Sequence, residues 1–96
     1  MFNLIRKWAR DRNLIEGATT QAQMLKMTEE VGELAHAIAR GKTDEARDAV
    51  GDCVVVLTIL SAQMGFGIED AIDEAYITIK NRKGRMVDGI WVKDEN

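Results

Sequence analysis

The chain has 96 residues, of which 46% are hydrophobic and 30% are charged, and its formal net charge is −3. This length fits one small domain over residues 1–96, and the balance of apolar and charged residues excludes a disordered chain. The acidic charge argues against a general nucleic-acid or membrane-surface binder, because such proteins are normally basic. The one cysteine, Cys53, excludes an internal disulfide and lies in an apolar run, where a buried thiol is the ordinary interpretation.

The N-terminal residues and the hydropathy predict where the protein resides. Residues 1–6 reach a charge too early for the apolar core of a secretory signal. The sequence also has no apolar run of the roughly 18 residues that a membrane-spanning helix needs. We therefore expect a soluble, cytoplasmic protein with no membrane partner.

Helical periodicity predicts four helices. Apolar residues at helical spacing indicate a short amphipathic helix over residues 2–12. Thr19 or Thr20 suits the N-cap of a second helix over residues 20–40, and Gly41 suits its C-terminal end. Proline is absent from the chain, which favours helix throughout.

A third helix is expected over residues 44–64, before the glycines of residues 65–67. Its segment 54–60 would form a strand on local propensity alone, but no turn precedes it and a lone strand would have no partner. A helix that is apolar all round is a buried one, and a chain this short cannot cover it on every side. We therefore infer a homo-oligomer, a homodimer or a homotetramer, that buries this segment.

A fourth helix is expected over residues 68–82, with cations at its C-terminal end, where the helix dipole favours them. Residues 84–96 are either a small hairpin around the Asp88–Gly89 pair or an extended tail. The predicted fold is all-α: a four-helix bundle in one domain with a short C-terminal tail or hairpin.

Five carboxylates form two clusters in the middle of the chain. Glu29, Glu30 and Glu33 make an EExxE that would fan over about 100° of one helix face. Asp48 and Asp52, four residues apart, would stack on one face of the next helix. Like charges this close repel, so an acidic fan beside an apolar stripe suggests a counter-ion. The alternative is a solvated helix face.

The register of the two clusters favours a metal site. The glutamates lie about 8 to 11 residues before the turn that joins the second and third helices, and the aspartates lie about 6 to 10 residues after it. If these helices pack antiparallel, a rise of about 1.5 Å per residue places both clusters at similar distances from the turn along the helix axes. Oxygen ligands without cysteine suit Mg²⁺ or Mn²⁺. Glu33 and His36 form an ExxH, but di-iron bundles need this unit twice and the chain has one histidine. His36 is therefore expected at the helix surface.

Ions of this kind hold substrate phosphates, and two of them could activate a water for attack on phosphorus. Basic side chains are available for the remaining phosphate charge, with a solvated helix end as the alternative interpretation of the later ones. They are Lys26, Lys80, Arg82, Lys83 and Arg85.

Three motifs follow one another along the chain: Lys26 three residues before the EExxE, the Gly51–Val55 run, and the Lys80–Arg82 triplet. At this spacing and chain length they resemble the MazG-like all-α nucleoside triphosphate pyrophosphohydrolases. The similarity covers nearly the whole chain, from the first helix to the basic end of the fourth. The EExxE alone is a loose pattern, whereas its combination with a glycine-aspartate pair that opens a hydrophobic helix is fairly specific.

The resemblance implies a four-helix bundle that dimerises, sometimes into tetramers, and binds Mg²⁺ between an EExxE helix and an ExxD helix. Members of the family cut a nucleoside triphosphate between the α and β phosphates and release a monophosphate and pyrophosphate. They act on deoxynucleotides, on damaged or non-standard nucleotides, or on alarmones, and nothing in this sequence selects among these classes.

Carried over residue by residue, the resemblance makes Glu30 and Glu33 metal ligands, and Asp52 the aspartate of ExxD. Glu29 would be a ligand or the base that deprotonates the attacking water. The substrate-binding candidates are Lys26, Lys80, Asn81 and Arg82 for phosphate, and, as weaker candidates, Trp8 and Gln23 for the base. For the tryptophan, a core position is the favoured interpretation.

The chain departs from the family pattern at Ala49, three residues before Asp52, where the family has glutamate. Asp48 is the natural stand-in. The departure best supports a different interpretation, a non-catalytic oligomeric helical module with a degenerate metal site. A nucleic-acid binder that uses residues 80–85 is disfavoured by the acidic total charge and by the lack of an aromatic-basic surface pattern.

Overall fold

The computed structural model describes residues 1–95. It contains the helices α1 (Phe2–Asp11), α2 (Thr20–Ala39), α3 (Thr43–Gln63) and α4 (Ile68–Ile79), followed by the strands β1 (Gly84–Val87) and β2 (Ile90–Lys93). The all-α class, the four helices and the C-terminal hairpin agree with the sequence-based prediction. The helix ends lie within three residues of the expected bounds.

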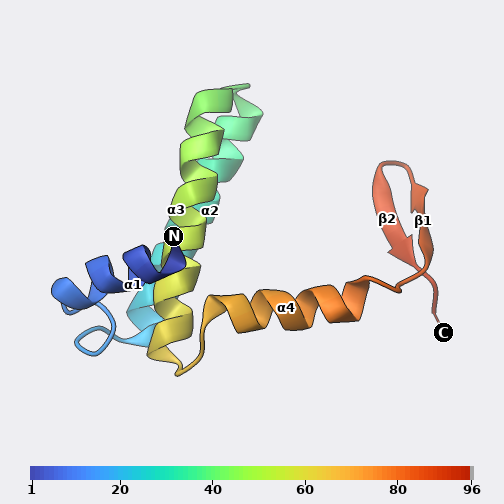
Figure 1. Ribbon diagram of the computed structural model, residues 1–96. Coiled ribbons are helices and arrows are strands. Elements are labelled where there is room, and N and C mark those ends of the chain that lie inside the picture. Colours follow the sequence, from blue (N-terminus) through green and yellow to red (C-terminus); the bar gives the residue numbers. More distant parts are fainter. Residues whose placement is uncertain (96) are drawn as a thin grey trace.

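Helices α2 and α3 form an antiparallel pair at the centre of the molecule (Figure 1). The first turn of α2 is capped by Thr19, whose Oγ1 accepts a hydrogen bond from the Ala22 amide at 3.1 Å. Gly41 follows α2 with a φ of +66°, in the left-handed region that glycine adopts without strain. The short connection that results returns the chain along α2 as α3.

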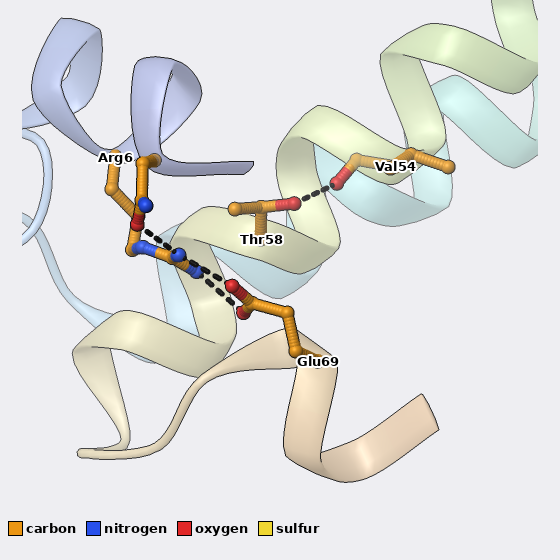
Figure 2. Close-up of polar contacts among 5 residues, drawn as sticks. Arg6, Val54, Thr58 and Glu69 are labelled. Atoms are coloured by element: carbon orange, nitrogen blue, oxygen red, sulfur yellow. Dashed lines mark hydrogen bonds and ion pairs between the residues drawn. The ribbon is translucent and has the colours of Figure 1, made fainter. Parts of the chain in front are cut away.

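The valine-rich segment of residues 54–60 is helical and lies within α3. Val56 and Ile59 are buried, as is Thr58, whose Oγ1 donates to the Val54 carbonyl at 2.7 Å (Figure 2). The hydroxyl is therefore satisfied inside the helix and costs little in the core. Packing against α1 and α2 outweighs the strand propensity of this segment.

Helix α4 leaves α3 at a sharp bend of 104°. Gly65 permits the bend with a φ of +88°. At the start of α4, Ile68 is buried and Glu69 accepts two hydrogen bonds from the Arg6 guanidinium of α1, at 2.7 and 2.6 Å (Figure 2). The first turn of α4 is thus held against the rest of the chain by a buried apolar side chain and by an ion pair.

The rest of α4 and the hairpin project away from α1, α2 and α3 (Figure 1). We name residues 68–93 the C-terminal arm, and α1 to α3 the helical body. The hairpin is antiparallel, with Gly84 opposite Lys93, and it turns at Asp88–Gly89, where both residues have positive φ. A Cβ at Gly84 would overlap the Trp91 ring, which explains the glycine at this position.

The arm makes the chain more extended than a compact domain. The Cα radius of gyration is 16.1 Å, whereas about 12 to 13 Å is expected for this length. No single helix among residues 1–95 is long and apolar enough to cross a membrane, and α3 and α4 reach that length and composition only when taken together across their bend.

Candidate metal centre

Three carboxylates converge between α2 and α3. One oxygen each of Glu30, Glu33 and Asp52 lie within 4.8 Å of one another. The two glutamates are close to one turn apart on α2, and the aspartate faces them from α3, because an antiparallel pair brings positions at similar distances from the turn to the same height. We name these three residues the acidic cluster.

Glu30 differs from the other two members because it is buried, with 5% of its surface exposed. Its Oε1 forms an ion pair with Lys26 Nζ at 3.2 Å, but its Oε2 is buried without a hydrogen-bond partner. A buried carboxylate oxygen without a donor is costly, and a cation would satisfy it. The orphaned oxygen is therefore a second observation, besides acidic crowding, that these residues fit a metal ion.

Crowding of negative charge changes the titration of the other two members. Hydrogen bonding to Glu30, together with its negative charge, raises the pKa of Glu33. Desolvation by burial raises the pKa of Asp52, with repulsion from Asp48 and Glu30 as smaller causes. Both shifts have the direction expected where the surrounding protein supplies too little positive charge.

A groove of about 460 Å³ adjoins the acidic cluster. Asp48 lines this groove together with Glu33 and Asp52, but it lies outside the group of three whose oxygens converge. His36 is exposed on the groove wall, 3.3 Å from the Arg40 guanidinium, which is the surface position expected for it. The groove is therefore strongly acidic, since Asp44 and Glu45 line it as well.

Comparison with known proteins identifies the family. Residues 18–86 match the MazG nucleotide pyrophosphohydrolase domain. The chain belongs to the MazG family. The match begins just before α2 and ends within β1, so it includes every member of the acidic cluster and most of the C-terminal arm.

A similar protein occurs in Haemophilus phage HP1 (strain HP1c1), where it is described as an uncharacterized 18.2 kDa protein in the rep-hol intergenic region. The two sequences are 49% identical over 59 residues, which make up 62% of this chain. The aligned region spans 36% of the phage protein's length. No solved structure matches the chain.

The departure from the MazG pattern at Ala49 has a clear structural setting. The residue is buried between α2 and α3 and lines the acidic groove. A glutamate at this position would add a carboxylate beside the cluster, whereas alanine leaves the space open. Asp48, one residue earlier, also lines the groove.

The other two residues of the first MazG motif lie next to the cluster. Glu29 is exposed, and its Oε1 is 3.6 Å from Lys26 Nζ. Hydrogen bonding to Glu30, and then the charges of Glu29 and Glu30, raise the pKa of Lys26. Lys26 is therefore a fixed cation at the edge of the acidic cluster, shared by a buried and an exposed glutamate.

Trp8 of α1 shares a pocket with Asp52. Both line an apolar pocket of about 430 Å³, with Leu4, Ile5 and Val55. Trp8 is 46% exposed, so the favoured interpretation of this tryptophan as a core residue is wrong for the single chain. The three aliphatic residues were not singled out in the sequence, because their helical spacing is that of any packed face. Gln23 is half-buried on α2 and lines neither this pocket nor the acidic groove.

The Lys80–Arg82 triplet lies at the far end of α4, distant from the acidic cluster of its own chain (Figure 1). From Asp52 to the end of α3 is about 16 Å, and α4 adds about 18 Å beyond the bend, which gives a separation of about 20 Å. Asn81 and Arg82 instead line a groove between the end of α4 and the end of β2. Within one chain, the structure does not bring these predicted phosphate-binding residues to the carboxylates.

Proposed function

We propose that this chain is a Mg²⁺-dependent hydrolase that converts a nucleoside triphosphate into a monophosphate and pyrophosphate. The observation that carries the proposal is the acidic cluster, with its buried and unpartnered Glu30 oxygen. Membership of the MazG family supports a nucleotide as the substrate. In this proposal residues 1–96 act as one domain, and Mn²⁺ can replace Mg²⁺.

The donor set fits a hard divalent cation, because every converging ligand is a carboxylate oxygen. Glu30, Glu33 and Asp52 would hold the ion, with Asp48 as a further carboxylate on the groove wall. When bound, Mg²⁺ would neutralise phosphate charge and make a nearby water more acidic.

The chain's own residues then perform the proton transfer and the positioning. Glu29, exposed beside the cluster, would accept a proton from the attacking water. The water oxygen forms a bond to the α-phosphorus, the bond from that phosphorus to the α–β bridging oxygen breaks, and pyrophosphate leaves with the electron pair. Lys26 and the Lys80–Arg82 triplet would contact phosphate oxygens, and Trp8 would stack on the base, with Gln23 as a weaker polar contact.

Pyrophosphate release tests the function directly. A panel of canonical and modified triphosphates is incubated with Mg²⁺, with Mn²⁺ and with chelator. We expect metal-dependent release with the monophosphate as co-product, and loss of this release in Glu33→Gln. Glu74→Gln, which removes an exposed carboxylate of α4, is the matched control and should retain turnover.

A non-catalytic oligomeric module is the second candidate, and the alanine at position 49 favours it. It predicts no pyrophosphate from any triphosphate, at protein concentrations where slow turnover would be detected, while the oligomer remains intact. It also predicts that Glu33→Ala or Asp52→Ala leaves stability unchanged or raises it, because each change relieves repulsion.

We propose in addition that the chain functions as a homodimer or homotetramer. Val50 and Leu57, apolar side chains of α3 that remain partly exposed in the single chain, support this. Sedimentation equilibrium measures the stoichiometry, and a monomer at micromolar concentration would contradict it.

A further inference from the structure

Lys26 shares one face of α2 with two members of the acidic cluster, because Lys26, Glu30 and Glu33 follow one another at helical spacing. It lies about one turn farther from the α2–α3 connection than Glu30 does. On its α2 side, by contrast, the acidic groove is lined by Glu33 and by residues that follow it. Lys26 lines neither this groove nor the pocket beside Trp8. Its charged neighbours are instead glutamates of its own helix.

The order of the Lys26–Glu30 pair is not the order that best stabilises a helix. Glutamate four residues before lysine is the better arrangement, and here the lysine comes first. The side chain of Glu30 is 7% exposed, whereas that of Lys26 is 50% exposed. The pair therefore brings a solvated cation to a buried carboxylate, which indicates a function in the metal centre rather than in the stability of α2.

The two oxygens of Glu30 have different surroundings. Oε1 lies 3.2 Å from Lys26 Nζ, whereas Oε2 is buried with no hydrogen-bond partner. Among residues 1–95, Lys26 is the only cation that forms a salt bridge with the acidic cluster. Since Oε2 is free while Lys26 is in place, a divalent ion can bind Glu30 without displacing the lysine, and it satisfies the buried oxygen at the same time.

We propose that Lys26 is a positioning residue for the metal ligand Glu30, because it holds Oε1 and thereby presents Oε2 alone to the divalent ion. The inference rests on the metal site of the proposed function, and it gives Lys26 a role that is separate from contact with phosphate. Side chains that bind a metal ligand from behind orient that ligand, and the loss of one typically costs about 10- to 100-fold in metal affinity or activity.

A Glu30 that binds through one oxygen keeps the ion accessible to substrate. Mg²⁺ takes about six ligands in octahedral geometry, and three carboxylates that give one oxygen each leave about three positions for water or phosphate oxygens. If Glu30 bound through both oxygens, one of these positions would be lost. Lys26 therefore helps to determine how many phosphate oxygens the ion can hold.

Titration of the full chain with Mn²⁺, without nucleotide, tests this role separately from phosphate binding. We expect Lys26→Met to weaken Mn²⁺ binding by about tenfold or more, and Lys26→Arg, which can keep the ion pair, to stay within about threefold of wild type. The matched control is Lys7→Met, which should bind Mn²⁺ as wild type does. Lys7 also precedes a carboxylate by four residues, with its Nζ 2.8 Å from Asp11 Oδ2, but it lies on α1 outside the cluster.

The hydration of bound Mn²⁺ distinguishes positioning from a merely structural effect, because solvent proton relaxation reports how many waters the bound ion holds. In Lys26→Met we expect the relaxation per bound ion to change by about a third, since Glu30 then binds through both oxygens or leaves the ion. A variant whose helix was only destabilised would bind less Mn²⁺ with an unchanged relaxation per ion. That result would overturn the inference.

These measurements separate failure of this inference from failure of the proposed function. A wild-type protein that releases no pyrophosphate, but whose Mn²⁺ binding depends on Lys26 as described, would refute the enzyme and retain the positioning role. An active wild-type protein whose Lys26→Met variant binds Mn²⁺ equally or more tightly would overturn the positioning role and retain the enzyme, because removal of a cation that only repels the metal strengthens binding. A wild-type protein that binds no Mn²⁺ would overturn the positioning role outright.

Discussion

The helical body and the C-terminal arm are stabilised by different means. Every buried residue of the described chain lies between Ala9 and Ile68, and beyond Glu69 all described residues except Ala71 and Gly84 are exposed. The body therefore owes its structure to contacts within the chain. The arm has regular secondary structure and apolar side chains but almost no tertiary contact, which is the pattern of a segment shaped to pack on another molecule.

The difference between body and arm predicts which substitutions alter the fold and which alter the assembly. Ile59→Ala in α3, at 3% exposure, should lower the free energy of unfolding by about 2 to 5 kcal/mol, because it leaves a cavity. Ile77→Ala in α4, at 63% exposure, should change it by less than about 0.5 kcal/mol in the monomer. Urea unfolding at a concentration below association measures both. Equal losses would mean that the arm packs on its own body.

Within the helical body, the acidic cluster and the rest of its groove are expected to differ in metal binding. We expect Asp52→Asn to weaken Mn²⁺ binding by about 100-fold or more, since even the outer partners of a bound metal are worth 10- to 100-fold. Asp48→Asn, in the same groove but outside the convergence, should have a smaller effect. Isothermal titration compares the two. A larger loss in the Asp48 variant would place the ion further along the groove.

The hairpin offers a substitution that affects the arm alone. A methyl group at Gly84 would overlap the Trp91 ring and the Val92 carbonyl. Gly84→Ala should therefore distort the hairpin and weaken self-association by about tenfold, while the unfolding of the body is unchanged. Gly51→Ala is the glycine control, because its added methyl meets no atom within 4 Å. Tryptophan fluorescence measures the distortion of the hairpin, and sedimentation measures the self-association. If Gly84→Ala also destabilised the body, the body and the arm would not be stabilised independently.

The ion pair between Arg6 and Glu69, at the junction of body and arm, should have the smallest effect on stability. This effect should depend on pH. The Arg6 guanidinium, mainly through its hydrogen bonds, lowers the pKa of Glu69 from 4.5 to about 2. A lowered carboxyl pKa stabilises the native state at pH values above 4.5, and this contribution is lost as the pH falls towards 2. The pair is partly exposed, so solvent screening keeps its contribution modest.

Thermal melts of wild type and Glu69→Gln check this expectation. The difference in stability should be constant at neutral pH and should shrink as the pH falls from 4.5 to 2. Glu74→Gln, on the same helix, serves as the control. A difference that grows towards acid pH would contradict the sign of the linkage.

Local sequence patterns predicted the helices and the relative positions of the carboxylates along the helix axes. The Thr19 cap, the glycine at position 41 and the spacing of the two acidic motifs were sufficient to predict α2 and α3 and their register. The EExxE pattern could not predict which of its adjacent glutamates is buried. Glu29 and Glu30 differ by 100° around the helix, and only the packing of α3 makes the second one buried and the first one exposed.

The direction of α4 could not be predicted from any local pattern. Arg6 and Glu69 are 63 residues apart, and neither belongs to a motif that indicates the pairing. The sequence identified the Lys80–Arg82 triplet as chemically suitable for phosphate, but a one-dimensional pattern cannot show that the bend after α3 separates it from the carboxylates. In this chain the sequence therefore predicts which chemistry a motif suits, but not where the motif lies relative to the others.

The ion pair between Arg6 and Glu69 also has an evolutionary consequence. The family match begins at residue 18, so the helix that supplies Arg6 lies outside it. The orientation of an element inside the matched region thus depends on a residue from an element beyond it. A lineage could change how its copies assemble by exchanging this leading helix, without altering a single residue of the carboxylate motifs.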